Sequence, residues 1–309
     1  MNKSAAIKND LYTLFQLTKR NIKLFLKDKA GVFFSLLAPL IVLLLYVLFL
    51  ADVQVMSVES YIPPELAVDS KLIKAYVDSW MVAGVISVAC ITVSLGANSI
   101  MVQDKTRGIL NDGLASPVKK YIIKLSYFVF NFIVTMIITG IVFLICLLYL
   151  FLTGGWALTV ADVFTLIGIL VLSNLSSTLL TVFICGFFKT ENVLGAATGI
   201  LSAILGFLIG AYMPMSIMPE VAQDISGVIP GSHSAGLFRQ YFMSGPLEKL
   251  GENLPQQVTD GLSQAFSMEV KFFDSVFQNK EMFLYLAGSI ILFLILNTIV
   301  ALTKKKKKK

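Results

Sequence analysis

The fold is decided at the junction between WMVAGVISVACITVSLGANSIMV (80–102) and DKTRGILNDGLASPVK (104–119). The first stretch is uncharged and long enough to cross a bilayer, because a membrane-spanning helix needs about 20 apolar residues. The second stretch carries acids, bases, glycines and a proline, and a charged side chain costs about 2.5–3.5 kcal/mol at the bilayer centre. The chain must therefore leave the membrane near residue 103.

The composition of the whole chain indicates the same class of protein. Of its 309 residues, 56% are hydrophobic and only 14% are charged, whereas soluble domains are about 45–50% apolar and about 25% charged. We therefore interpret the chain as an integral membrane protein. Cys90, Cys146 and Cys185 all lie in apolar runs, so we interpret them as packing residues and expect neither a disulfide framework nor a metal site.

Six apolar runs are long enough to span a membrane. They lack the period-two alternation of membrane strands, so we predict an all-α polytopic membrane protein with a single transmembrane domain over residues 1–309. Pro39 lies inside the first run and predicts a kink there. The predicted spans are 31–51, 79–102, 125–152, 163–188, 193–215 and 282–303.

The distribution of charge predicts the orientation of these spans. The segments 1–30, 103–124, 189–192 and 304–309 hold 19 of the 25 Lys and Arg residues but only 5 of the 19 acids. The positive-inside rule assigns such segments to the cytosolic side. We therefore expect both termini in the cytosol and a multi-pass protein of the plasma membrane.

The segment before the first span has helical periodicity. In 7–29 the apolar residues recur at helical spacing, and most of the lysines lie off the apolar stripe. Such a helix lies in the membrane interface with its lysines at lipid phosphates. We predict an amphipathic interfacial helix, either as a general anchor or as a border of a partner's docking site.

The charged stretch itself predicts a short helix over 104–115. Ile109, Leu110, Gly113 and Leu114 would cluster on one side of it. Ser116-Pro117 ends the turn, because the residue before a proline is pushed out of the helical region. The expected product is a short cytosolic helix with an apolar patch, held between two spans.

This stretch resembles the first cytosolic loop of the ATP-binding-cassette type-2 exporter permeases. That loop has an acidic-basic start, a glycine, two apolar residues, a leucine and a Ser/Thr-Pro close. The resemblance implies that 104–115 is a coupling helix gripped by a separate ATPase subunit. The first motif position, usually a glutamate, reads Gln103-Asp104 here. The implied coupling residues are Asp104, Lys105, Arg107, Gly108, Ile109, Leu110, Gly113, Leu114, Ser116 and Pro117.

A second stretch with the same resemblance follows the fifth span. In MPMSIMPEVAQDISGVIPGSHSAGLFRQ (213–240), Pro219, Pro230 and Arg239 occupy the family's positions. The resemblance implies short re-entrant helices within an extracellular segment, 216–281, although the loop after Arg239 is longer than in the family pattern. Arg239 would pair with a nearby acid or reach lipid phosphates.

The fifth span carries small residues at four-residue spacing, which lets helices approach closely in lipid. Packing within the chain and packing between two copies both explain this spacing, and the resemblance implies a homodimer seam along the first and fifth spans. The residues are Gly195, Gly199, Ala203, Gly206 and Gly210.

The chain lacks the usual catalytic signatures. GSHSAG (231–236) departs from G-x-S-x-G, and His233, the only histidine, is adjacent in sequence to Ser234, so we set aside a serine hydrolase. No G-x4-G-K-[ST] occurs, so ATP and Mg would be bound by the partner and no cofactor by this chain. The predicted spans contain almost no ionisable residues, which argues against an ion-coupled secondary transporter.

The sequence thus leads to the membrane subunit of an ATP-driven exporter. The resemblance implies a homodimer with two cytosolic ATPase subunits, in contact with membrane lipids and with no nucleic acid. Drug, peptide, lipid and polysaccharide cargo all remain open, with an ion-coupled carrier and an intramembrane serine hydrolase as alternative functions.

Overall fold

The computed structural model describes residues 3–66 and 68–303. In this part of the chain, all regular structure is helical except for one antiparallel hairpin, in which Val270 pairs with Phe277. The elements are α1 Lys3–Lys27, α2 Lys29–Leu45, the π-helical turn Tyr46–Leu50, α3 Ala51–Glu59, α4 Ser70–Ala97, α5 Ser99–Thr106, α6 Ile109–Ala115, α7 Lys120–Leu152, α8 Val160–Cys185, α9 Glu191–Leu208, the 3-10 turn Met215–Ile217, α10 Glu220–Val228, α11 Pro230–Phe242, α12 Ser244–Gly251, α13 Gln256–Ala265, β1 Val270–Phe272, β2 Ser275–Phe277 and α14 Asn279–Thr303.

Within residues 3–66 and 68–303, six helices are long and apolar enough to cross a membrane, which confirms the predicted all-α polytopic fold. The first span combines α2, the π-helical turn and α3, with Pro39 inside α2, and the second combines α4 and α5. The six are Lys29–Glu59, Ser70–Thr106, Lys120–Leu152, Val160–Cys185, Glu191–Leu208 and Asn279–Val300.

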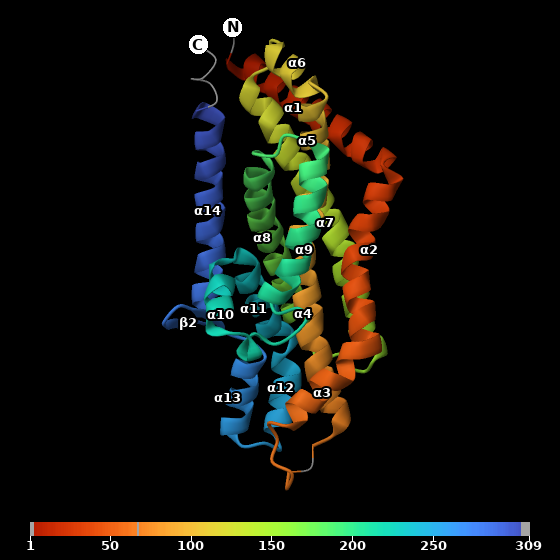
Figure 1. Cartoon of the computed structure of the whole chain (residues 1–309), viewed down its shortest axis with the longest axis vertical. Coiled ribbons are helices and arrows are strands. Elements are labelled where there is room, and N and C mark those ends of the chain that lie inside the picture. The colour runs from red at the N-terminus through yellow and green to blue at the C-terminus, as the bar shows by residue number, and fades with distance from the viewer. Residues whose placement is uncertain (1–2, 67, 304–309) are drawn as a thin grey trace.

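The molecule is elongated and its two ends differ (Figure 1). Helices α1, α5 and α6 and the C-terminal end of α14 lie at one end, which we call the terminal end. Helices α12 and α13 and the end of α3 lie at the other, which we call the cap end. Residues 304–309, which the distribution of charge assigns to the cytosolic side, lie outside the described part of the chain.

Helix α4 forms the centre of the bundle. It packs against α2, α7, α8, α9 and α11, and nearly all of its residues from Tyr76 to Ala97 are buried. Buried polar side chains join it to its neighbours. Ser94 Oγ donates to Asn131 Oδ1 of α7 at 2.8 Å and lies 2.6 Å from Thr181 Oγ1 of α8. Hydrogen bonds of this kind hold helices together in lipid, where no water competes for the same groups.

Three predicted span boundaries differ most from the structure, and the first span ends at Glu59 instead of 51. The second span begins at Ser70 instead of 79 and so contains Asp78, whose buried carboxylate accepts hydrogen bonds from Tyr46 at 3.2 Å and Tyr149 at 3.0 Å. The fifth span ends at Leu208 instead of 215 because Gly210 takes a positive φ of 70° and stops the helix.

The predicted interfacial helix corresponds to α1, but only part of it packs on the bundle. Phe25 is buried against Phe130 of α7, with ring centroids 5.9 Å apart. Ile7, Leu11 and Phe15 remain about 60% exposed. The N-terminal half of α1 therefore presents an uncovered apolar stripe, as an interfacial helix does.

Candidate functional site

The predicted helix 104–115 consists of two helices with a reversal between them. Helix α5 continues the second span to Thr106, and α6 begins at Ile109. Gly108, at the break, has a φ of 80°, a conformation that costs other L-residues about 1–2 kcal/mol. The expectation of one continuous helix from Asp104 is therefore wrong. Asp104 and Lys105 belong to the end of a span, and only 109–115 form the projecting helix.

The predicted apolar patch on this helix is also divided. Leu110 packs on the cluster formed by α1, α4 and α7, and a side-chain atom at Gly113 would meet Ile123 of α7 at 3.6 Å. Ile109 is 41% exposed, and Asn111 and Asp112 are exposed beside it. The side chain of Leu114 lies outside the described residues. The exposed face of α6 therefore carries both apolar and polar side chains, because Leu110 points toward the bundle.

Asp104 anchors the start of the reversal to two other helices. Its carboxylate accepts hydrogen bonds from both terminal nitrogens of Arg20 on α1, one of them at 2.8 Å, and from the Tyr127 hydroxyl of α7 at 2.6 Å. The Asp104 side chain is 3% exposed and that of Arg20 is 36% exposed. A bidentate Arg–carboxylate pair fixes orientation as well as distance, so α1, α5 and α7 are joined at one point.

The next three residues of the reversal contact the connection between α8 and α9. Lys105 donates to the carbonyl of Gly186 at 3.1 Å and to that of Phe188, and Thr106 donates to the carbonyl of Lys189 at 3.2 Å. Lys105 thereby binds carbonyls just beyond the C-terminal end of α8, a favoured place for a cation. Arg107 Nε lies 4.0 Å from a carboxylate oxygen of Glu191, the first residue of α9.

The far side of the reversal is closed by Ser116 and Pro117. Ser116 leaves the helical conformation, and its hydroxyl donates to the carbonyl of Gly113 at 2.6 Å. Beyond it, Lys119 forms an ion pair with Asp10 of α1, whose carboxylate also accepts from the Tyr121 hydroxyl at 3.0 Å. The ammonium group of Lys119 lowers the pKa of Asp10 below its ordinary value of 3.8.

The sequence analysis missed the partners that hold this segment, Arg20, Tyr127 and Glu191. A usable signal existed for Arg20, because a carboxylate at the edge of an apolar span needs a cation, and Arg20 lies in the adjacent predicted interfacial helix. No comparable signal marked Tyr127, because a tyrosine within an apolar run is common.

At the cap side of the fifth span, Arg239 is completely buried. Its guanidinium donates to the carbonyls of Ile209 at 3.2 Å, Gly210 at 2.6 Å and Ser267 at 3.3 Å, and it lies 5.6 Å above the ring of Trp80. The expected acidic partner is absent, since no carboxylate of the described residues lies within 4 Å. Arg239 instead binds the carbonyls that follow the end of α9.

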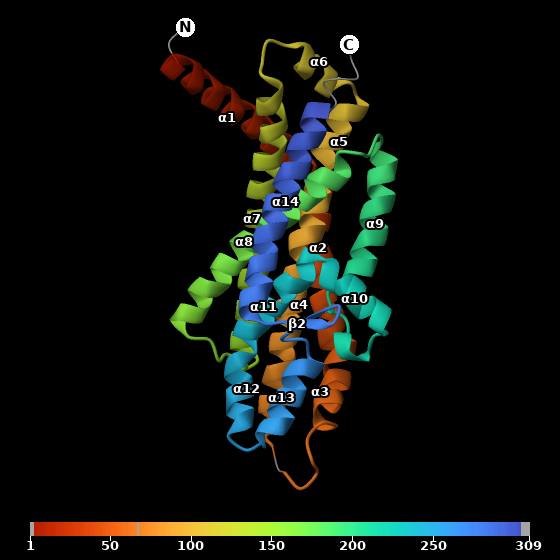
Figure 2. The same ribbon diagram turned by 90° about the vertical axis from the view of Figure 1, so that its left-hand side faces the viewer.

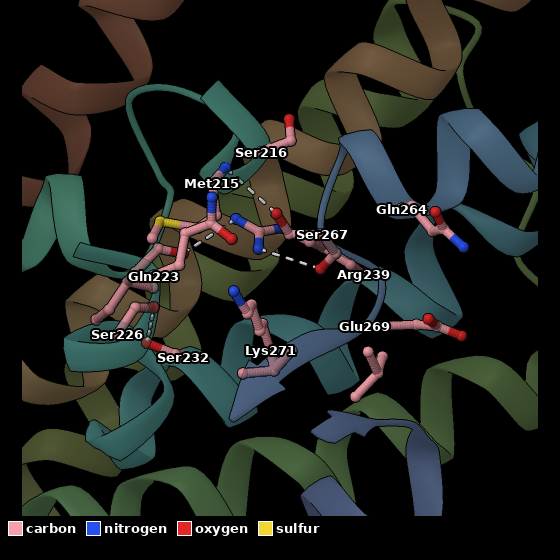
Figure 3. Close-up of a pocket in the computed structure, with 13 residues that line it drawn as sticks. Met215, Ser216, Gln223, Ser226, Ser232, Arg239, Gln264, Ser267, Glu269 and Lys271 are labelled. Atoms are coloured by element: carbon pink, nitrogen blue, oxygen red, sulfur yellow. Dashed lines mark hydrogen bonds between the residues drawn. The ribbon is translucent and has the colours of Figure 1, made fainter. Parts of the chain in front are cut away.

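Arg239 also lines a pocket of about 290 Å³ (Figure 3). The pocket mixes charges, because Lys271 pairs with Glu220 at 2.7 Å and Glu269 accepts from Gln278 at 3.0 Å. The remaining walls are hydroxyls, amides and a few apolar side chains. The lining residues are Ile209, Met215, Ser216, Gln223, Ser226, Ser232, Arg239, Gln264, Ser267, Glu269, Val270, Lys271 and Val276.

The two prolines of the outer motif begin helices. Pro219 precedes the first residue of α10, and Pro230 is the first residue of α11, positions where the missing N–H costs nothing. Helix α11 is buried among α4, α8 and α14. Its His233 donates through Nε2–H to the Gly227 carbonyl at 2.6 Å, and Ser234 donates to the Pro230 carbonyl at 3.3 Å. Each side chain is thus engaged with the backbone.

The small-residue stripe of the fifth span has two different parts. A side-chain atom added at Gly195 or Gly199 would meet no other atom within 4 Å, and Ala203 is exposed. At Gly206 the same atom would overlap the ring of Tyr212. Packing within the chain therefore explains Gly206, and the positive φ explains Gly210, but neither explains Gly195, Gly199 and Ala203.

Comparison with known proteins gives one family. The family described as ABC-2 type transporter matches residues 12–243, a range that runs from α1 to just past the end of α11. A comparison with curated proteins gave no match.

Proposed function

Because this chain belongs to the ABC-2 type transporter family, we propose that it is the membrane subunit of an ATP-driven exporter that moves amphipathic, lipid-like, drug or peptide cargo out of the cytosol. The family makes the chain a multi-pass permease component, which works with an ABC ATPase and is normally not the ATPase itself. Export as the direction, the class of cargo and the binding of ATP and Mg by the partner are parts of the proposal.

We propose that the protein lies in the plasma membrane with its terminal end on the cytosolic side. The support is the clustering of Lys and Arg in the segments at that end, as the positive-inside rule requires. In this orientation α6 faces the ATPase, and α12 and α13 face outward.

The observation that carries the proposal is the set of contacts around the reversal at 104–117. The exposed face of α6 is available to a partner, while Asp104 holds α1 and α7 and Lys105 holds the connection to α9. A push on α6 by a closing ATPase would therefore move the second, third and fifth spans together. Packed elements joined in this way transmit rigid-body motion.

A homodimer is the second part of the proposal. Gly195, Gly199 and Ala203 form a smooth strip on α9 that no described segment of the chain covers, flanked by Ile200 and Ile204, which are 61% and 46% exposed. Close approach of two helices in lipid uses such strips. The cargo path would run beside this seam.

The test is co-purification with the ATPase subunit, followed by an ATPase assay. Ile109→Asp places a charge on the exposed face of α6 and should abolish the association. Val160→Asp is the matched control, because Val160 is 76% exposed at the first residue of α8, away from α6. Equal loss in both variants, or no loss in the first, would contradict the proposal. Leu110→Asp is a poor choice here, because Leu110 packs inward.

An ion-coupled carrier is a second candidate, and one observation favours it. Asp78 lies buried in the second span with its carboxylate held by two tyrosines from the first and third spans, and buried acids of this kind mark ion pathways. Transport that persists with a catalytically dead ATPase partner but stops in Asp78→Asn would favour this candidate over the first.

A further inference from the structure

Helices α8 and α14 pack closely toward the terminal end and separate toward the cap end. Near the terminal end, Asn297 donates to the Leu179 carbonyl at 2.9 Å, and further along, Ser176 Oγ lies 2.7 Å from Ser289 Oγ. Figure 2 shows the first turns of α8 leaning away from α14. The two spans therefore enclose a wedge that opens toward the cap end.

This wedge is an apolar cleft of about 680 Å³. Helix α11 closes its inner side with Leu237, which is 3% exposed, and with Tyr241. Among the described residues, no acidic side chain lines it. The lining residues are Thr165, Gly168, Ile169, Val171, Leu172, Leu175, Leu237, Tyr241, Asn279, Lys280, Phe283 and Leu284.

The length of the cleft matches the thickness of one leaflet of a bilayer. On α8 it extends from Thr165 to Leu175, which is about 15 Å at 1.5 Å per residue. The hydrocarbon of a bilayer is about 30 Å thick, so one leaflet contributes about half of that. The cleft begins near the cap-side end of both spans, where lipid headgroups lie.

The rim of the cleft carries one cation at this level. Lys280 is the second residue of α14, lies beside Asn279 and Thr165, and forms no ion pair within 4 Å in the part of the chain that the structure describes. The neighbouring Glu281 caps α14 by accepting from the Gln278 amide at 3.2 Å. A lysine above an apolar surface at the headgroup level favours a phosphate.

We propose that this cleft binds one phospholipid of the leaflet at the cap end, with an acyl chain between α8 and α14 and the phosphate at Lys280. An open gap between two spans would forfeit van der Waals contacts along its whole lining, and a lipid tail restores them. The site lies between the fourth and sixth spans, away from the strip on α9, and does not depend on the ATPase or on the orientation of the chain.

Photocrosslinking in nanodiscs tests the tail. The discs contain phosphatidylcholine with a minor fraction of phosphatidylglycerol that carries a diazirine on one acyl chain, and mass spectrometry maps the crosslinked residues. Labels should concentrate on 165–175, Phe283 and Leu284. Leu144 and Leu148 of α7, which are 64% and 55% exposed, are the reference for ordinary lipid contact. Labelling of the cleft no stronger than this reference would overturn the proposal.

Gly168 allows the cleft to be filled without harm to the fold. It is exposed, and an added side-chain atom meets nothing within 4 Å. Gly168→Phe should remove the labels from the cleft and leave those on α7. Gly140→Phe is the matched control, because Gly140 also has open space but lies on α7. Cleft labelling that survives Gly168→Phe would overturn the proposal.

Lys280→Gln tests the headgroup. It should reduce labelling by the phosphatidylglycerol probe about fivefold, the effect of one lysine near a lipid surface. Labelling by a diazirine-bearing diacylglycerol, which has the same tails and no phosphate, should not change. Equal responses of the two probes would refute the assignment of Lys280 to a phosphate.

Discussion

The pair Arg20–Asp104 yields the most quantitative prediction. Arg20→Ala leaves a carboxylate that is 3% exposed and has Tyr127 as its one remaining donor among the described residues. Breaking a buried ion pair costs about 3–5 kcal/mol, but Arg20 is 36% exposed and solvent screening discounts the value. We therefore expect Arg20→Ala to lower the free energy of unfolding by about 3 kcal/mol. Asp104→Ala should cost about 2 kcal/mol, because the freed Arg20 can reach solvent.

The double variant distinguishes a true pair from two separate contacts. Once one partner is gone, loss of the other removes little more, so Arg20→Ala with Asp104→Ala should cost about 3 kcal/mol in total, a coupling of about 2 kcal/mol. The assay is unfolding in mixed micelles by titration with SDS, followed by circular dichroism. Lys23→Ala, an exposed change on the same helix, should fall within about 0.5 kcal/mol of the parent. Strictly additive costs would refute the reasoning.

Three further predictions concern the terminal end and α9. Lys119 lowers the pKa of Asp10 below 3.8, so the ion pair should stabilise the fold above pH 4 and lose its effect as the pH falls through the lowered pKa. The difference in stability between the parent and Asp10→Asn, measured against pH, should therefore shrink only in acid. Gly108→Ala should destabilise the protein by about 1 kcal/mol, because the φ of Gly108 is 80°. Gly113→Ala should be neutral or slightly stabilising, because Gly113 is helical and an added side-chain atom lies 3.6 Å from Ile123. Equal effects of the two variants in thermal melts would contradict this prediction. Gly199→Leu should leave the monomer folded and abolish the dimer, as measured by light scattering. Gly206→Leu should lower the melting temperature, because the new side chain collides with Tyr212. A dimer that persists in Gly199→Leu would refute the proposed seam.

The positions of the spans could be predicted from the sequence because lipid imposes one strong rule. Each span must be a long apolar helix, so hydropathy alone located all six. Hydropathy does not predict a span boundary that depends on a single contact. The fifth span ends early because Gly210 turns and Arg239 binds the carbonyls there, and the two residues are 29 positions apart.

The position of the candidate coupling segment was predicted from the sequence, but its division into two helices was not. The sequence of charges, Gly108 and Pro117 marked a loop between spans. Whether Leu110 faces a partner or the bundle depends on the reversal at Gly108, and that reversal turns α6 back onto α7. Hydrophobic periodicity within seven residues does not distinguish these two faces, because each carries an apolar residue, Ile109 on the exposed face and Leu110 on the packed one.

The enclosure of α4 has a consequence for biogenesis. Ser87 donates to the Gly231 carbonyl at 2.6 Å, and Gly84 lies against Ala211, so one flank of the second span is sealed by segments that the ribosome makes more than a hundred residues later. Until α11 emerges, that flank presents hydroxyls to the translocon or to lipid. Truncation before residue 230 should therefore yield nascent chains whose second span is recognised by membrane quality-control proteases.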